Sequence, residues 1–437
     1  MSFSFSMKQL AGAALSLVLA VPVFVKDAQA QSSLGSSEIR QCLSIQNAIQ
    51  LSVQRDPDVL VAQQAEESAA ASVTEARALY RPSVSVFGRS GFGDAGAVDN
   101  SVSSQIGLRA SQRVFDFGDA KYARAFARAN EKATVEETQA VRLQTALETG
   151  LTWLDYLEAS DQMTLTNERE QYFERQLNAV DQALLEGGAT RTERATVASR
   201  LADAQSFALE LKFRRSRSQT QLEIDTGQTL NPCSSDNFID TASTSLVLPD
   251  RVVSRALSNN PEINALRHRA KAAEADRDRR KRARLPVINL VATGSYASFD
   301  RFDNFRFRDR IGVDVSVPLY SGGTLSAGNR RASAQLSIAK GQLLDAERAV
   351  ETDIRIAMDR IEFLRKQKKA RAEVEDQARL QFEAAQIEQR AGTQTLRELI
   401  EIRLEFESAS LQCVRTRYDL LREQMRLLMI TGELAAS

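Results

Sequence analysis

The amino-acid sequence contains one pattern twice, and the two copies lie about 204 residues apart. "YRPSVSVFG" in the first half matches "RLPVINLVA" in the second half, and "RVFDFGDA" matches "PLYSGGTL", with Gly118 opposite Gly323. Further on, "EGGATRTERATVASRLADA" matches "RAGTQTLRELIEIRLEFES", with Gly188 opposite Gly392. Matches in the same order at nearly one offset indicate a tandem duplication. The chain must therefore fold from two similar halves.

Both halves have the same predicted order of elements. A helix ends at a proline, two short strands follow, a glycine turn leads into a helix of about 65 residues, and a glycine-containing break precedes a last helix. In repeat 1 we predict helices at 44–80, 119–185 and 191–225, with a β-hairpin at 83–112 (strands 83–89 and 105–112). In repeat 2 we predict helices at 250–284, 324–389 and 394–430, with a β-hairpin at 287–317 (strands 287–296 and 310–317). At 1.5 Å per residue, each long helix would span on the order of 100 Å.

The N-terminus has the features of a secretory signal peptide. Lys8 supplies the positive charge, residues 10–25 form an apolar stretch, and Ala28-Gln29-Ala30 is a small-residue cleavage site. The alternative, a transmembrane anchor, is disfavoured because the apolar run has only about 16 residues. We therefore predict export, and divide the chain into a signal peptide (1–30), an N-terminal segment (31–43), repeat 1 (44–228), an inter-repeat linker (229–249), repeat 2 (250–433) and a C-terminal tail (434–437).

The chain has three cysteines, whose spacing matches no zinc or redox motif. In an oxidising compartment Cys42 and Cys233 could form a disulfide, since each lies just before one repeat. Cys413 lies in a helical pattern and is interpreted as a buried small residue.

Composition and periodicity favour long packed helices. Aromatic residues make up only 6% of the chain, which argues against several compact mixed cores. In "ALETGLTWLDYLEASDQM", four leucines form one stripe among charged residues, as in a coiled coil; they are Leu147, Leu151, Leu154 and Leu157. Periodicity alone leaves a solvated helical rod as an alternative.

All four predicted strands have one apolar and one polar face. Ile311, Val313 and Val315 alternate with Gly312 and Asp314, for example. This alternation fits a transmembrane barrel with its apolar face towards lipid, and the alternative is a small soluble sheet packed on the chain's own helices. Two hairpins cannot close a barrel, and an open edge cannot exist in lipid because its backbone groups would be unpaired. A membrane-embedded sheet of this kind must therefore be completed by other copies of the chain.

Charge and motif content argue against an enzyme or a nucleic-acid partner. Lys and Arg total 57, as do Asp and Glu, so no net charge attracts nucleic acid. The single histidine, His268, has no evident catalytic partner. The basic stretch 267–284 also contains acidic residues; it precedes a strand, where it could meet anionic lipid headgroups or simply be a solvated face. We predict no catalytic residue, no metal site and no cofactor.

Several of these segments resemble TolC-type outer-membrane efflux proteins. "LPVINLVATGSY", "VSVPLYSGG" and "GTQTLRELIEIRLEFESA" are similar to the second repeat of that family, while "RPSVSVFG", "SQRVFDFG" and "EGGATRTERATVASRLADAQ" are similar to its first repeat. The resemblance covers roughly 44–433. It implies a mixed α fold with transmembrane β-strands, in which a homotrimer shares one 12-stranded β-barrel, four strands per chain, in the outer membrane. A long α-helical coiled-coil tunnel would continue from the barrel into the periplasm.

The resemblance also implies roles for individual residues. Glu398 and Glu401 correspond to acidic residues that ring the periplasmic constriction of the family, and threefold repetition would make six carboxylates that favour cations. A periplasmic latch and two kinds of turn would involve further positions: Gln389, Arg390, Gln394 and Arg397 in the latch, Gly187, Gly188, Ala391 and Gly392 in turns facing an adaptor protein, and Gly118, Gly322 and Gly323 in the turns from barrel to tunnel. Where the family often has Tyr and Arg in the latch, this chain has Gln389 and Gln394. The alternative for the two glutamates is an ordinary charged helix surface.

The function predicted is a passive exit duct of a tripartite efflux pump or a type I secretion system. Its expected partners are further copies of the chain, outer-membrane lipid, a periplasmic adaptor and an inner-membrane pump or ABC exporter. A structural or adhesive coiled-coil trimer without transport activity is the alternative.

Overall fold

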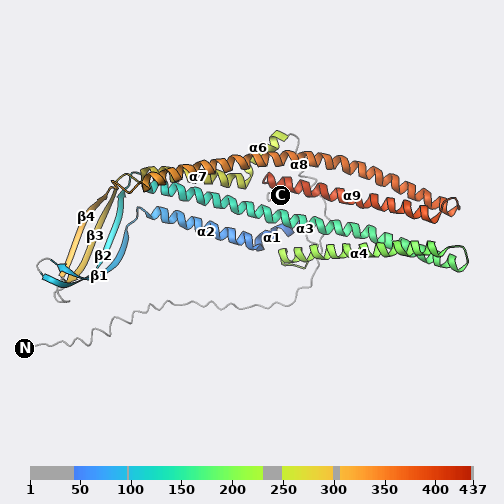
Figure 1. Ribbon diagram of the computed structural model, residues 1–437, viewed down its shortest axis with the longest axis horizontal. Coiled ribbons are helices and arrows are strands. Elements are labelled where there is room, and N and C mark those ends of the chain that lie inside the picture. Colours follow the sequence, from blue (N-terminus) through green and yellow to red (C-terminus); the bar gives the residue numbers. More distant parts are fainter. Residues whose placement is uncertain (1–43, 96–97, 230–248, 299–305, 435–437) are drawn as a thin grey trace, which may run out of the picture. The chain divides into compact units, whose positions relative to one another are not determined.

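The structure consists of long helices joined to one small sheet. This computed structural model describes residues 44–95, 98–229, 249–298 and 306–434, all within one compact unit, Cys42–Ser437. The predicted signal peptide and both Cys42 and Cys233 lie outside the described residues, so their disulfide stays a prediction. The elements (Figure 1) are α1 (Ile45–Arg55), α2 (Pro57–Ala78), β1 (Ser83–Ala95), β2 (Val98–Phe115), α3 (Asp119–Leu185), α4 (Arg191–Thr226), α6 (Pro249–Asn259), α7 (Pro261–Arg282), β3 (Val287–Ser298), β4 (Arg306–Ser316), α8 (Thr324–Arg390) and α9 (Leu396–Ile430).

The two longest helices have the same length, 67 residues each. α3 begins after Gly118 and α8 after Gly323, and both glycines have positive φ angles, 98° and 84°. A residue with a side chain rarely adopts this conformation, so glycine allows the chain to turn from strand to helix there. Their bounds differ from the predicted ones only by one residue at the end of α8.

The first helix of each repeat is not continuous, contrary to the single helices predicted at 44–80 and 250–284. Asp56 separates α1 from α2, and Asn260 separates α6 from α7. Each precedes a proline, which lacks an N–H group and disfavours a helical conformation in the preceding residue. The side chains of Asp56 and Asn260 then cap the next helix, the first accepting from Asp58 N at 2.7 Å.

The helices nearest the sheet form a row. α2 contacts α3, α3 contacts α7, and α7 contacts α8. Beyond that row, α4 packs on α3, α9 packs on α8, and α3 also contacts α9, which joins the two repeats (Figure 1). A cluster of buried side chains including Trp153, Leu222 and Met425 packs α1, α3, α4 and α9 together.

The four strands form one antiparallel sheet in the order β1-β2-β3-β4. They are longer than predicted, because each hairpin extends further towards its loop. The apolar face of the sheet is open: Val86 is 72% exposed and Ile311 is 79% exposed. The alternative of a sheet packed on the chain's own helices is therefore wrong for the described strands. No described helix has an apolar stretch long enough to cross a membrane.

Candidate functional site

The ends of the two helical hairpins, remote from the sheet, are built alike. Gly187, at φ 77°, follows the end of α3, and Gly392, at φ 79°, follows the end of α8. After each helix end, a backbone N–H returns to a carbonyl five residues earlier, Gly188 N to Ala183 O at 2.7 Å and Thr393 N to Glu388 O at 3.0 Å. This is a Schellman-type termination, which uses glycine at positive φ. Gly392 thus corresponds to Gly187, not to Gly188 as the sequence comparison predicted.

Each following helix starts with a capping box. In α9 the Glu398 carboxylate accepts from Thr395 N at 2.9 Å and from Thr395 Oγ1 at 2.8 Å, while Thr395 Oγ1 accepts from Glu398 N. In α4 Thr190 and Glu193 make the same contacts. The hydrogen bonds from Thr395 backbone and side chain hold the pKa of Glu398 below its usual value. Glu398 therefore has a structural role in this chain, whether or not it also lines a channel.

Glu401 lies one turn further along α9 and is exposed. Among the described residues it forms no ion pair or side-chain hydrogen bond, so its carboxylate faces solvent without a local structural role. The four predicted latch residues lie around the same turn, but none of their side chains forms a hydrogen bond or ion pair within the described chain; they are Gln389, Arg390, Gln394 and Arg397. The Oε1 atom of Gln394 is buried without a hydrogen-bond partner. The latch stays a prediction.

A buried polar cluster that the sequence did not reveal joins α9 to α3. Arg403 donates from Nε to Glu407 at 2.7 Å, and Arg169 on α3 lies 3.2 Å from the other oxygen of Glu407. The Arg403 guanidinium also lies 5.0 Å from the ring centroid of Tyr172 and 4.9 Å from that of Phe382. Burial raises the pKa of Glu407, although Arg403 and Arg169 act in the opposite direction. The only sequence signal was the spacing of four between Arg403 and Glu407, which places them on one helix face.

Further along the same two helices, Tyr418 donates to Asp161 at 2.7 Å, and Arg422 contacts both Asp155 (2.6 Å) and Glu158. These contacts pair side chains of repeat 2 with side chains of repeat 1. Together with the buried cluster they connect the two repeats within one chain.

The junction between β2 and α3 is held by a buried carboxylate. Asp116, only 1% exposed, accepts from Tyr80 Oη at 2.5 Å, Gly118 N at 3.0 Å and Ala120 N at 2.9 Å, and from Arg113. Burial raises the pKa of Asp116, but the hydrogen bonds from Tyr80, Ala120 and Gly118 more than offset it and hold the pKa below its usual value. Burial and the bond to Asp116 raise the pKa of Tyr80 to about 12.

The equivalent junction of repeat 2 is open. It turns through Gly322 and Gly323 at positive φ, and Ser321 stands where repeat 1 has Asp116. Leu319 and Tyr320 in this junction are 94% and 89% exposed.

The basic segment before β3 is largely engaged within the chain. Arg279 lies 3.1 Å from Asp119, Arg277 lies 2.7 Å from Asp278, and Arg282 stacks 4.2 Å from the ring centroid of Tyr122. This segment is therefore a set of local ion pairs more than a free cationic patch.

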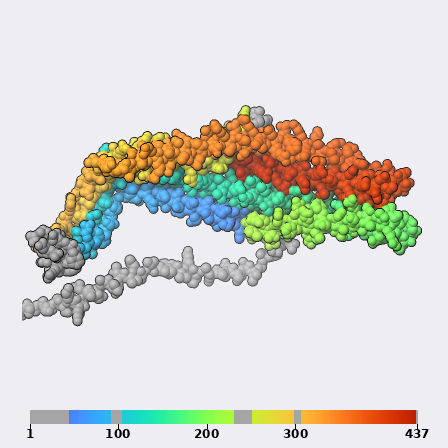
Figure 2. Space-filling model, in the orientation of Figure 1, coloured from blue at the N-terminus to red at the C-terminus, as the bar shows by residue number. Residues whose placement is uncertain are grey.

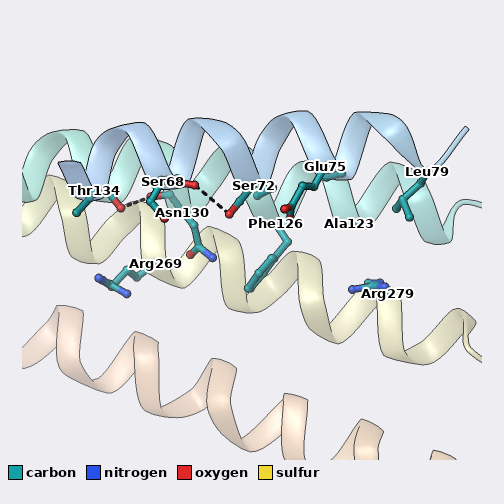
Figure 3. A pocket seen from close by; sticks show the side chains of 14 residues that line it. Ser68, Ser72, Glu75, Leu79, Ala123, Phe126, Asn130, Thr134, Arg269 and Arg279 are labelled. Atoms are coloured by element: carbon teal, nitrogen blue, oxygen red, sulfur yellow. Dashed lines mark hydrogen bonds between the residues drawn. The ribbon is translucent and has the colours of Figure 1, made fainter. Parts of the chain in front are cut away.

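Catalytic chemistry finds no support in the described residues. Burial and nearby Lys271 lower the pKa of His268, and no group of His, Cys, Asp and Glu in the described part could hold a metal ion. A groove of about 540 Å³ lies between α2, α3 and α7 (Figure 3). Half of its lining residues are Ala or Ser, and the Phe126 ring lies inside it. Arg269 at its border pairs with Glu137 at 2.6 Å. Its charged residues do not converge on a reacting position.

Comparison with known proteins agrees with this architecture. The chain is 23% identical over 375 residues to the outer membrane efflux protein BepC of Brucella suis, covering 84% of this chain and 80% of BepC. It is 24% identical over 282 residues to the alkaline protease secretion protein AprF of Pseudomonas aeruginosa, covering 63% of this chain and 59% of AprF. Among solved structures, the outer membrane protein VceC of Vibrio cholerae has a TM-score of 0.77 at 16% identity, covering 89% of this chain and 96% of VceC. The CmeC outer membrane channel of Campylobacter jejuni has a TM-score of 0.76 at 16% identity, covering 89% of this chain and 85% of CmeC.

A model of the outer membrane efflux protein family matches residues 48–228 and 252–433, which correspond to the two repeats. The predicted resemblance, fold class and outer-membrane location are thereby confirmed. The family and the fold are those of channel proteins, not of enzymes. This chain belongs to the outer membrane efflux protein family.

Proposed function

We propose that three copies of this chain form a passive exit duct, in which each copy supplies its four strands to one 12-stranded barrel. The observation that carries this proposal is the exposed apolar face of a sheet with only four strands. Four strands cannot close into a barrel, and an open edge in lipid leaves backbone groups without hydrogen bonds. Three copies supply an even number of strands within the range of known barrels.

The helices continue the duct on the periplasmic side. α3 and α8 each have 67 residues, so at 1.5 Å per residue each is on the order of 100 Å long. Such helices place the ends of the two helical hairpins far from the membrane, where a periplasmic adaptor and an inner-membrane pump or ABC exporter could engage them. Both hairpin ends expose apolar side chains beside the glycine turns, with Leu185 at 89% and Ile387 at 65% exposure. Exposed apolar groups at such turns suit a protein partner.

The constriction is proposed to be acidic, with Glu401 as its main charge. Glu401 is exposed and has no local structural role, whereas the Glu398 carboxylate is engaged in its capping box. Three copies of both residues would place six carboxylates in a narrow lumen, which favours cations.

Planar-bilayer recording of the purified oligomer tests the duct and its constriction together. The variant Glu398→Gln/Glu401→Gln removes both charges while glutamine at position 398 can still accept from Thr395 in the capping box. We expect lower cation selectivity and weaker block by divalent cations than in the wild type. The matched control is Glu193→Gln, which makes the same change in the equivalent capping box of α4 and should leave both properties unchanged.

Absence of any ion conductance would contradict the duct itself. Conductance with selectivity and divalent block equal to those of the wild type would contradict only the acidic constriction.

A further inference from the structure

The sheet and the row of helices that continues it each have one outer element from repeat 1 and one from repeat 2. β1 and β4 are the outer strands of the sheet, and α2 and α8 are the outer helices of the row that continues it. Figure 2 shows one border in blue, where β1 and α2 lie, and the other in orange, where β4 and α8 lie. Within the chain, repeat 1 meets repeat 2 where β2 pairs with β3 and α3 packs on α7. A second copy would meet this one by bringing its β1 and α2 against β4 and α8.

The strands of the two hairpins pair in the same register, so each residue of the first hairpin has a defined counterpart in the second. Val84 pairs with Ala110 in the first hairpin, and Ile288 pairs with Val315 in the second. β1 therefore maps onto β3 with an offset of 204, from Val84 to Ile288, and β2 maps onto β4 with an offset of 205, from Ala110 to Val315. The pairing of β2 with β3 can be carried by these offsets onto β4 and the β1 of a neighbouring copy.

Building on the trimeric barrel proposed above, we propose that β4 pairs antiparallel with β1 of a second copy in the register that places Asp314 directly opposite Arg89. This pair is the counterpart of Arg109 opposite Thr293 within the chain. In the same register Val313 lies opposite Ser90 and Val315 opposite Gly88, as counterparts of the two neighbouring β2–β3 pairs.

Charge complementarity supports this register independently of the repeat. Arg89 and Asp314 are both exposed, and neither forms an ion pair with any described residue. Both lie on the polar face, opposite to the face of Val313 and Val315, so a shift by one residue would place them on different faces. A shift by two residues would place Asp314 opposite Phe87 or Gly91. Only the proposed register brings the two opposite charges face to face.

The exposed junction of repeat 2 also lies where the proposed register would bring a second copy. Within the chain, Phe115 at the end of β2 pairs with Ile288 at the start of β3. The same offsets bring Tyr320 against Val84 of the second copy. Both side chains are now exposed, Tyr320 at 89% and Val84 at 71%, and the proposed contact would cover them. The occupant of this border is therefore a second copy of the chain.

Cysteine cross-linking of the full-length protein in detergent tests the register. The native cysteines Cys42, Cys233 and Cys413 are first replaced by serine. Ser90→Cys/Val313→Cys places two thiols directly opposite each other, whereas the matched control Ser90→Cys/Ile311→Cys displaces one thiol by two residues on the same face. The Cβ atoms of two residues directly opposite each other on neighbouring strands lie about 4.5–5.5 Å apart, whereas diagonal neighbours lie about 7–8 Å apart. A disulfide requires Cβ atoms about 3.5–4.5 Å apart, so only the directly opposite pair can form one with little movement. On mild oxidation we expect reducible inter-chain products to form at least tenfold faster in the first variant.

The possible results separate the register from the duct. Equal or faster cross-linking of the control, or no cross-linking in a protein that light scattering shows to be trimeric, would overturn the register and leave the duct intact. A monomer by light scattering would overturn the proposed assembly as well. As a second measurement, Arg89→Asp and Asp314→Arg should each lower the temperature at which the oligomer dissociates in SDS, and the double exchange should restore it. Failure of the double exchange to restore it would count against the ion pair.

Discussion

The buried carboxylate at the β2–α3 junction offers the most specific test of how this fold is held. Asp116→Asn keeps the size of the side chain but replaces one carboxylate oxygen by an NH₂ donor. Oδ1 accepts from Tyr80 and Gly118 N, and Oδ2 accepts from Ala120 N and Arg113. In either orientation of the amide, its NH₂ group therefore faces a backbone N–H donor. No rotation of the side chain relieves this conflict.

The magnitude follows from what the substitution leaves unpaired. A buried donor without an acceptor costs about 1–3 kcal/mol, and hydrogen bonds to a charged group contribute about 1.5–3 kcal/mol. Because these contributions overlap, we expect a loss of about 3 kcal/mol per chain. Unfolding entropy near the midpoint is about 2.1 cal/mol/K per residue, or roughly 0.9 kcal/mol/K for the 437 residues. The unfolding midpoint should therefore fall by about 3 °C.

The assay is thermal unfolding in detergent followed by circular dichroism at 222 nm, at one protein concentration and scan rate. The control is Ser321→Ala, the equivalent position in repeat 2, where the side chain makes no hydrogen bond to a described residue; surface changes of this kind are usually within about 0.5 kcal/mol.

The Asp116 carboxyl also makes the difference pH-dependent. Its pKa is lowered in the folded chain from the ordinary 3.8, so its stabilisation is present above that value and is lost as the pH falls through the folded pKa. The difference in unfolding midpoint between the wild type and Asp116→Asn should then become smaller as the pH falls. A midpoint within 1 °C of the wild type at pH 7 would refute the hydrogen-bond argument.

Five further substitutions test other parts of the chain. Thr395→Ala and Thr190→Ala each remove a capping box and should cost about 1 kcal/mol, seen as faster hydrogen exchange in the first turn of α9 or α4. Gly323→Ala forces a side chain into φ 84° and should cost about 1–2 kcal/mol, whereas Gly328→Ala within α8, with open space around it, should stabilise by about 0.5–1 kcal/mol in the same thermal assay. Burial raises the pKa of Glu407 above its ordinary 4.5, so its contribution to stability is complete below that value and is lost as the pH rises through the folded pKa. Glu407→Gln should therefore flatten the decline of the unfolding midpoint as the pH rises above 4.5.

Sequence patterns predicted the elements where the signal is local. Alternation of apolar and polar residues marked the strands, and the absence of proline with glycine at both ends marked α3 and α8. The helix breaks at Asp56 and Asn260 were missed although each precedes a proline. The patterns around them, "RDPDVLVAQ" and "NNPEINALR", are otherwise helical, and only the X-Pro rule marks the boundary.

The role of Glu398 as a capping residue also has a local signal in the sequence. Thr395 and Glu398 are three residues apart before an apolar stretch, as are Thr190 and Glu193, which is the capping-box pattern. The contacts of Asp116 had no such signal. Tyr80 lies 36 residues away from it in the chain, and only the folded hairpin brings the two together. The buried cluster around Arg403 likewise depends on α3, α8 and α9 meeting, which no periodicity within one helix predicts.

The difference between the two junctions leads to a last prediction. Repeat 1 closes its junction within the chain through Asp116, whereas repeat 2 leaves Tyr320 and Leu319 exposed. If a second copy covers that surface, the repeat 2 junction stabilises the assembly and the repeat 1 junction stabilises the chain itself. Burying a large aromatic side chain contributes about 1.5–3 kcal/mol, which corresponds to about a ten- to hundredfold change in a dissociation constant. Tyr320→Ser should then weaken each interface between copies by about that factor, measured by light scattering on dilution in detergent. The unfolding midpoint of the separated chain should not change, because Tyr320 is exposed there. An oligomer as stable as the wild type would show that no neighbour covers Tyr320.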